Sequence, residues 1–296
     1  MNPGTLNWQS KLVLLLVFPV VGAELLLQSL WWLHQYPSIA FWNLGLSLLL
    51  GLAAWQSKSA TVRGAVAGAV LCALLMFATT SIPYAAWRTD LTPVLTLLVL
   101  TSLATRTGRS QKQRLGTAED KHGRLASQVA ANLGMAALVC NGMTLAWMIG
   151  FGPIDWVEWR QSLIFAPGLA ALAEAAADTV SSELGQLWQG QPRLLTTLQR
   201  VPAGTDGAIS LPGTLAGVMA ALIVSAAGVW PLGGTATLFW VSLLGGIFGL
   251  FFDSLLGATL ERWNWLGNDA VNFLSTGAAA AAAFALLAAL LRVHVG

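Results

Sequence analysis

The sequence predicts an all-α fold: a polytopic membrane helix bundle of about nine transmembrane helices with a cytoplasmic N-terminus. Of its 296 residues, 56% are hydrophobic and only 9% are charged, whereas about a quarter of the residues of a soluble domain are charged. The apolar residues also form runs near the length of about 20 that one helical crossing requires. Fourteen Trp residues suit the two membrane interfaces, where an apolar ring with a polar edge is stable.

The expected spans follow one another along the whole chain, and the second and fourth are short enough to be tilted or broken helices. Gly and Pro inside several spans are tolerated, because neighbouring helices satisfy the backbone groups that they free. We treat residues 1–296 as a single integral-membrane domain, in which the first two spans, residues 1–58, are peripheral to a motif-bearing core, residues 60–292. The nine runs are residues 12–33, 39–55, 63–82, 90–105, 125–150, 161–184, 209–230, 235–258 and 270–292.

Basic residues predict the orientation, since Lys and Arg accumulate on the cytoplasmic side. With the N-terminus inside, 12 of the 15 Lys and Arg residues are cytoplasmic, all but Arg88, Arg160 and Arg292. An odd number of spans then places the C-terminus outside. The net charge of +2 gives no indication of a nucleic-acid partner, and the two cysteines form neither a disulfide pattern nor a zinc motif. We expect a multi-pass protein of the cell (inner) membrane whose polar clusters face the cytoplasm.

Three carboxylates stand at the end of the otherwise apolar run 161–184: Glu174, Asp178 and Glu183. Glu174 and Asp178 are four residues apart and therefore share a helix face. Charged groups near the hydrocarbon are costly and usually functional. Because Mg²⁺ prefers carboxylate oxygens together with water and phosphate, the segment predicts a metal–phosphate site. The alternative is a polar helix end that merely reaches the cytoplasm.

A basic loop leads into the fifth run. Lys121 and Arg124 precede the helix, and Arg124, Gln128 and Asn132 are spaced by four, so they lie on one helix face. The free N–H groups and the dipole of a helix start favour phosphate. The positive-inside rule accounts for the basic residues of the loop, but not for Gln128 and Asn132 within an apolar run.

The segment RVPAGTDGAISLPGTLAG, residues 200–217, alternates Gly with hydroxyl-bearing and acidic residues. Glycine permits close backbone approach, and successive N–H groups form anion-binding nests. Glycine-rich turns between spans are also common without a ligand, and the segment is not the phosphate loop of soluble nucleotidases. Its candidate phosphate-binding residues are Gly204, Thr205, Gly207, Ser210, Gly213 and Thr214.

Two further segments bring polar residues to the cytoplasmic side. FFDSLLGA carries Asp253 inside the eighth run, where a lone Asp without a partner is not expected to stay charged. The ninth run opens with Asn268, Asp269 and Asn272, although Asp269 has helix capping as an alternative role. Asp253 therefore joins the three carboxylates above as a candidate metal ligand.

Taken in order, these segments resemble the membrane family that includes transmembrane protein 19 and plant phytyl-phosphate kinase. The matching segments are GAVAG at 64–68, KHGRLASQVAANLG, AAADTVSSELG, VPAGTDGAISLPGTLAG, FFDSLLGA and NDAVNFLST, over roughly residues 60–280. The chain departs from the family pattern at Leu133, where a second small residue or glycine is expected.

The resemblance implies a kinase that transfers a phosphoryl group from a nucleoside triphosphate, CTP being the expected donor, to an isoprenyl monophosphate such as phytyl or geranylgeranyl phosphate. The residues themselves indicate the same class of reaction, phosphoryl transfer. Mg²⁺ or another divalent cation would bind Asp178, Glu183, Asp253 and Glu174, while Lys121 and Arg124 bind phosphate and Gln128, Asn132 and Asn272 orient it. The partners are thus a nucleoside triphosphate, a lipid phosphate and the bilayer, with a homo-oligomer left open.

Two other functions compete with this one. A cytidylyltransferase that forms a CDP-lipid needs a similar metal–nucleotide site. An ion-coupled transporter also contains intramembrane acids and broken helices. Carriers, however, place their sites near the membrane midplane and carry an internal repeat, whereas here the polar residues gather at one face and no repeat is evident.

Overall fold

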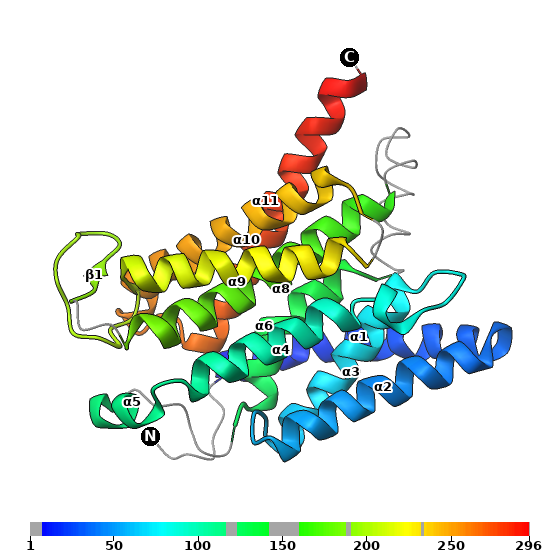
Figure 1. Cartoon of the computed structure of the whole chain (residues 1–296), viewed down its shortest axis with the longest axis horizontal. Helices are drawn as coiled ribbons and strands as arrows, with labels where there is room; N and C mark the ends of the chain where they lie inside the picture. The colour runs from blue at the N-terminus through cyan, green and yellow to red at the C-terminus, as the bar shows by residue number, and fades with distance from the viewer. Residues whose placement is uncertain (1–7, 117–122, 142–159, 188–190, 232–233, 296) are drawn as a thin grey trace.

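The computed structural model describes residues 8–116, 123–141, 160–187, 191–231 and 234–295. These residues form a bundle of helices with one small antiparallel hairpin (Figure 1). The elements before residue 142 are α1 (Trp8–Gln35), α2 (Pro37–Gln56), α3 (Val62–Thr79), the 3₁₀ turn η1 (Ala86–Arg88), α4 (Leu91–Arg106), α5 (Arg109–Leu115) and α6 (Ala126–Val139). Those after residue 159 are α8 (Arg160–Gly185), β1 (Arg193–Leu194), β2 (Ala208–Ile209), α9 (Leu211–Val229), α10 (Ala236–Leu256), the π-helical turn η3 (Gly257–Glu261) and α11 (Asn268–Val295).

The all-α membrane fold is confirmed, but the number of spans differs from nine. Within the described residues, seven helices are long and apolar enough to cross a membrane, and the bent pair α4–α5, with 62° between its halves, makes an eighth if it is one span. The expected span 125–150 corresponds to α6, which has only 14 residues, while residues 142–150 lie outside the described part. The sidedness of the bundle stays a prediction.

Helix α8 lies at the centre of the bundle. In its most apolar window 89% of the residues are buried, against 22% for α1. It packs against α4, α6, α9, α10 and α11. Its run of alanines allows this, because small side chains let helix backbones approach closely. The carboxylates of α8 are thus surrounded by protein and not by lipid.

Capping residues fix where several helices begin. Thr61, Ser210 and Thr235 each accept a hydrogen bond from a backbone N–H in the first turn of α3, α9 and α10 respectively, which satisfies a donor that the helix leaves free. Ser210 directly follows β2, which pairs antiparallel with β1. The hairpin therefore carries the glycine-rich segment, and Figure 1 shows it at the same end of the bundle as α5.

Candidate active site

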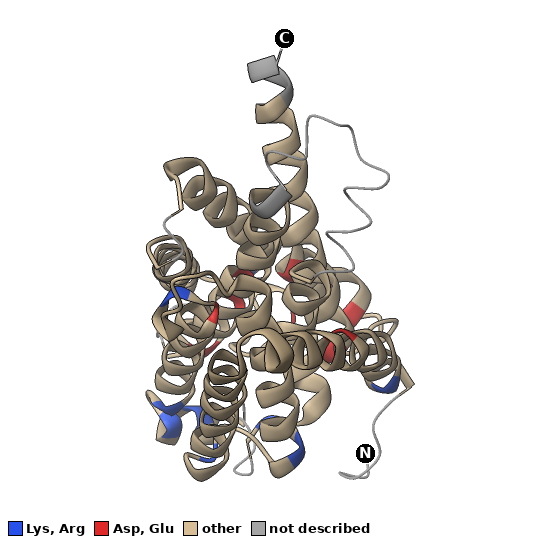
Figure 2. Ribbon diagram, turned by 90° about the vertical axis from the view of Figure 1, so that its right-hand side faces the viewer, with Lys and Arg blue, Asp and Glu red and all other residues tan. Residues whose placement is uncertain are grey.

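An acidic cavity of about 280 Å³ opens between α8, the glycine-rich segment, α10 and the start of α11. Four carboxylates line it: Asp178, Asp206, Asp253 and Glu261. The rest of the lining consists mainly of Ser, Thr, Asn and Gly, and among the described residues it includes no Lys or Arg. Figure 2 shows Asp and Glu mostly in the middle of the bundle and Lys and Arg nearer its margins. Four acids without a basic neighbour in the lining favour binding of a cation.

Glu174 lies deeper, one helical turn before Asp178, and is only 1% exposed. Gly249 of α10 makes room for it, since a Cβ at that position would lie 2.5 Å from Glu174 Cγ. Asp178 and Asp253 lie close enough to influence each other electrostatically, and Ser275 of α11 lies beside both Glu174 and Asp253. Three helices thus bring together residues that are about 100 positions apart in the chain.

Two of these buried carboxylate oxygens, Glu174 Oε1 and Asp253 Oδ2, have no hydrogen-bond partner among the residues that the structure describes. An unpaired buried polar atom is costly, so both oxygens fit a ligand that donates hydrogen bonds or carries positive charge. In the described part of the chain, no group of three or more His, Cys, Asp or Glu side chains is arranged to hold a metal by itself. Mg²⁺ usually takes one or two carboxylates and completes its shell with water and substrate phosphates, so a magnesium site here stays a prediction.

The glycine-rich segment has two parts: the part before α9 lines the acidic cavity, and the part within α9 packs on α8. Gly204 and Gly207 have positive φ values of 84° and 69°, and both line the cavity together with Thr205 and Ser210. A Cβ on Gly207 would lie within 2 Å of the backbone of η3, at 1.9 Å from Ala258 N. Glycine at this position therefore lets the loop close against the turn that carries Glu261.

Gly213 and Thr214 do not line the acidic cavity. A Cβ on Gly213 would lie 2.8 Å from Ser181 O and 2.9 Å from Gly185 Cα, so this glycine permits close packing of α9 on α8. The structure gives Gly213 a packing role, and its predicted contact with phosphate has no support from its position.

The three polar residues at the start of α11 have different positions. Asn268 and Asn272 line the acidic cavity. Asn272 Nδ2 also donates to Asn132 Oδ1 at 3.1 Å, which brings together two of the residues expected to orient phosphate. Asp269 instead accepts a hydrogen bond of 2.6 Å from Ser10 Oγ of α1 and does not line the cavity.

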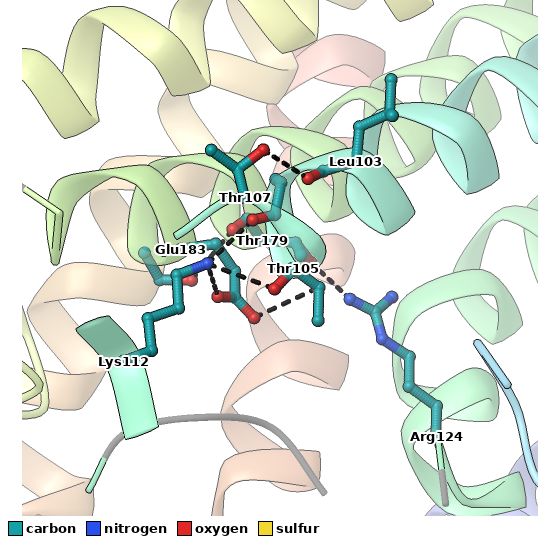
Figure 3. A network of polar contacts seen from close by, with 9 residues as sticks. Leu103, Thr105, Thr107, Lys112, Arg124, Thr179 and Glu183 are labelled. Carbon is teal, nitrogen blue, oxygen red and sulfur yellow. Dashed lines mark hydrogen bonds and ion pairs between the residues drawn. The ribbon is translucent and has the colours of Figure 1, made fainter. Parts of the chain in front are cut away.

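Arg124 reaches the acidic site from its flank. Its backbone is fixed by Ser59 O, which accepts from Arg124 N–H, and by Thr61 N–H, which donates to Arg124 O. Its side-chain Nη2 donates to Thr179 Oγ1 at 3.3 Å, next to Asp178 (Figure 3). Gln128, by contrast, accepts a hydrogen bond of 2.7 Å from Leu125 N–H at the start of α6. Lys121 lies outside the described residues.

Glu183 forms a buried ion pair with Lys112 of α5, with 2.5 Å between Nζ and Oε2. Thr105 Oγ1 donates to its other oxygen at 3.1 Å, and Lys112 Nζ also donates to Ala104 O at 2.8 Å, as Figure 3 shows in part. Glu183 does not line the acidic cavity. Its role as a metal ligand stays a prediction, and its contacts give it a second role in holding α5 against α8.

Sequence reasoning missed Glu261 and Lys112. Glu261 follows Asp253 by about two helical turns, and this spacing could have indicated that both acids lie on one helix face. The π-helical turn that orients this stretch, however, has no evident sequence signature. Such turns are frequent at functional sites. Lys112 sits in a basic stretch of the kind that normally faces water, and nothing in that pattern distinguishes the one lysine that is 1% exposed.

Comparisons with known proteins identify relatives of the chain. The family model described as Integral membrane protein DUF92 matches residues 45–280. An uncharacterized membrane protein of Synechocystis is 35% identical over 204 residues, 68% of this chain and 74% of that protein. One of Methanocaldococcus jannaschii is 44% identical over 108 residues, 36% and 45% of the two chains. The chloroplastic protein VTE6 of Arabidopsis thaliana is 30% identical over 181 residues, 60% and 52%. The last two are thus matched over about half their lengths. No solved structure matches.

Proposed function

The chain belongs to the integral membrane family DUF92, and we propose that it is a membrane kinase which transfers the terminal phosphoryl group of a nucleoside triphosphate to an isoprenyl monophosphate. One observation carries the proposal. A cavity at one end of a membrane bundle is lined by four carboxylates, with an arginine at its flank. Phosphoryl transfer needs this combination of groups, because it depends on metal-bridged phosphates and on neutralisation of developing charge.

Asp178 and Asp253 would hold the divalent cation, with Glu174 behind them as a further acid. When bound there, Mg²⁺ would supply positive charge that neutralises the donor phosphates and the charge of the transition state. The positive-φ glycines Gly204 and Gly207 turn the loop around the donor phosphates. Glu183 stays a possible ligand in this proposal only if its ion pair with Lys112 opens.

The protein need not supply a nucleophile. An oxygen of the acceptor monophosphate attacks the terminal phosphorus of the donor, so that a new P–O bond forms while the P–O bond to the leaving nucleoside diphosphate breaks. The acceptor oxygen is already negatively charged, and no strong general base is required. Arg124 lies where it can neutralise charge beside Asp178, and Asn272 where it can orient a phosphate.

The test is a transfer assay with the purified full-length protein in detergent. The protein is incubated with CTP or ATP labelled in the terminal phosphate, Mg²⁺, and phytyl or geranylgeranyl monophosphate. We expect label in the prenyl diphosphate and none when Mg²⁺ is replaced by EDTA. With label in the α-phosphate, appearance of a CDP-lipid would instead identify a cytidylyltransferase. Solute flux in proteoliposomes without consumption of triphosphate would identify a transporter.

Variants of the acidic cavity test the metal assignment. Asp178→Asn and Asp253→Asn should each lower turnover by at least a hundredfold, because a neutral amide is a poor ligand for Mg²⁺. Glu24→Gln is the control, since Glu24 is a buried acid on α1 that accepts a hydrogen bond from Gln28 and does not line the cavity. Wild-type turnover in both Asp variants would refute the assignment.

A further inference from the structure

A second polar cavity, of about 220 Å³, is lined by basic and not by acidic residues. Its four cations are Lys58 after α2, Arg106 at the end of α4, Arg109 at the start of α5 and Arg124 before α6. Five Ser and Thr side chains complete the polar wall, and among the described residues the lining has no Asp or Glu. The positive-inside rule explains the side of the membrane on which such cations lie, but not their convergence on one cavity.

An apolar cavity of about 70 Å³ continues from the basic one, between α2, α3, α4 and α6. The two share Ser59, Leu98, Thr101 and Arg124 in their linings, so they meet. Along α4 the lining changes from Arg106 at the helix end, through hydroxyls, to Leu98 and other apolar residues deeper in the bundle. Polarity thus falls with depth, as it does along a lipid from its head group to its tail.

The apolar cavity is too small for a whole prenyl chain, but on one side it lies where helix packing is sparse. Helix α4 packs mainly on α8 and α9 and only sparsely on α2 and α3. A chain that begins in the cavity can therefore leave between α4 and the α2–α3 pair into the bilayer. Leu133, at which the chain departs from the family pattern, also lines this cavity.

We propose that the joined cavities are the acceptor site for a lipid phosphate monoester, with the phosphate among the cations and the start of the chain in the apolar cavity. This inference rests on the proposed function and deepens it, since it separates the acceptor from the donor. A nucleotide fits the basic cavity less well for two reasons. The carboxylates that would bind its metal ion line the other cavity, and a polar nucleotide has no group that matches the adjoining apolar cavity.

The acceptor and donor cavities meet at two polar contacts. Arg124 lines the basic cavity and donates to Thr179, which neighbours Asp178 of the acidic one. Asn132 lines the apolar cavity and accepts from Asn272, which lines the acidic one. A phosphate held by Arg124 therefore lies next to the carboxylates assigned to the metal, where its oxygen can reach the terminal phosphorus of the donor.

Direct binding tests the acceptor site independently of catalysis. Full-length protein in nanodiscs of phosphatidylcholine is titrated with radiolabelled geranylgeranyl monophosphate without nucleotide. Arg109→Gln should weaken binding about tenfold, the value of one charged hydrogen bond to phosphate. Arg114→Gln removes an exposed arginine from the same short helix that does not line the cavity, and its affinity should equal that of the wild type. Equal affinities in all three proteins would overturn the proposal.

A second pair of variants tests the apolar half. Leu98→Trp fills the junction of the two cavities, whereas Leu95→Trp adds the same ring on the exposed face of α4. Only Leu98→Trp should abolish binding of the lipid phosphate, and the nucleotide affinity of both should match the wild type. Geranylgeraniol and inorganic phosphate should each compete at least a hundredfold more weakly than the monophosphate. Competition by geranylgeraniol or by inorganic phosphate at equal strength, or loss of nucleotide affinity instead, would overturn the assignment.

The two proposals fail separately. If the protein binds the lipid phosphate with this pattern of variants but transfers no phosphoryl group, the kinase proposal falls and the acceptor site stands. If the protein transfers the phosphoryl group, but both Arg109→Gln and Leu98→Trp leave the KM for the acceptor unchanged, the acceptor-site proposal is wrong and the kinase proposal is kept.

Discussion

At the scale of single residues, variants of the buried ion pair between Lys112 and Glu183 distinguish a structural role of Glu183 from a metal-binding one. Lys112→Met should destabilise the protein by about 3–5 kcal/mol, because it leaves a buried carboxylate without its partner. Thermal unfolding in detergent measures this. Arg114→Met, on the same short helix but exposed, should leave the unfolding temperature unchanged.

The double variant Lys112→Met/Glu183→Leu separates the two roles. It should recover most of the lost stability, since replacing a whole buried ion pair by apolar side chains is often neutral. If Glu183 only holds α5 against α8, the Mg²⁺ concentration for half-maximal transfer stays at the wild-type value. A large rise in that concentration in a stable double variant would show that Glu183 is a ligand.

The candidate residues were predictable to different degrees for physical reasons. Asp178 and Asp253 stand out in sequence because an acid in an apolar run is expensive, and both line the cavity. Asp269, an acid at the start of an apolar run, and Gly213, from the glycine-rich segment, were candidates as well, but they contact Ser10 and α8 respectively. Sequence spacing places a residue on a helix face, yet it does not determine which neighbouring helix that face meets.

At the scale of helices, hydropathy located the elements but not the centre of the bundle. The most apolar stretch of α1 has a mean hydropathy of 2.1, which exceeds the 1.4 of the corresponding stretch of α8, although α8 is by far the more buried. The reason is that lipid is as apolar as a protein core, so that the most apolar helices can face the bilayer. The central helix is marked by small residues and by acids instead.

Close contact between α8 and α9 depends on glycine. A Cβ on Gly217 would lie 2.8 Å from Ala177 O and 2.9 Å from Ser181 Cβ, so Gly217→Ala must push the two helices apart. We expect a loss of about 1–3 kcal/mol, as for other overpacked interiors. Gly45→Ala is the matched control, because a Cβ there would have no atom of another described element within 4 Å. Equal unfolding temperatures of the two variants would contradict this account of the interface.

At the scale of the whole molecule, Thr105 of α4 and Lys112 of α5 both contact Glu183 near the end of α8. Arg124 and Asn132 link the basic and apolar cavities to the acidic one. The order of polar segments along the chain predicted one polar face, and this convergence was therefore accessible from sequence. The division of that face into an acidic and a basic cavity was not, since it depends on how α4 is placed between α2, α3 and α8.

Sidedness is the last prediction, and it depends on α6. Its 14 residues span about 21 Å at the helical rise, less than the roughly 30 Å of the hydrocarbon core. If this segment nevertheless crosses once together with the residues that follow it, nine crossings place the termini on opposite sides. An N-terminal fluorescent-protein fusion should then glow in the bacterial cytoplasm, while a C-terminal alkaline phosphatase fusion is active in the periplasm. A C-terminal fluorescent fusion that glows, with an inactive phosphatase, would show an even number of crossings and would contradict this orientation, since either α6 or the bent pair α4–α5 would then not span the membrane.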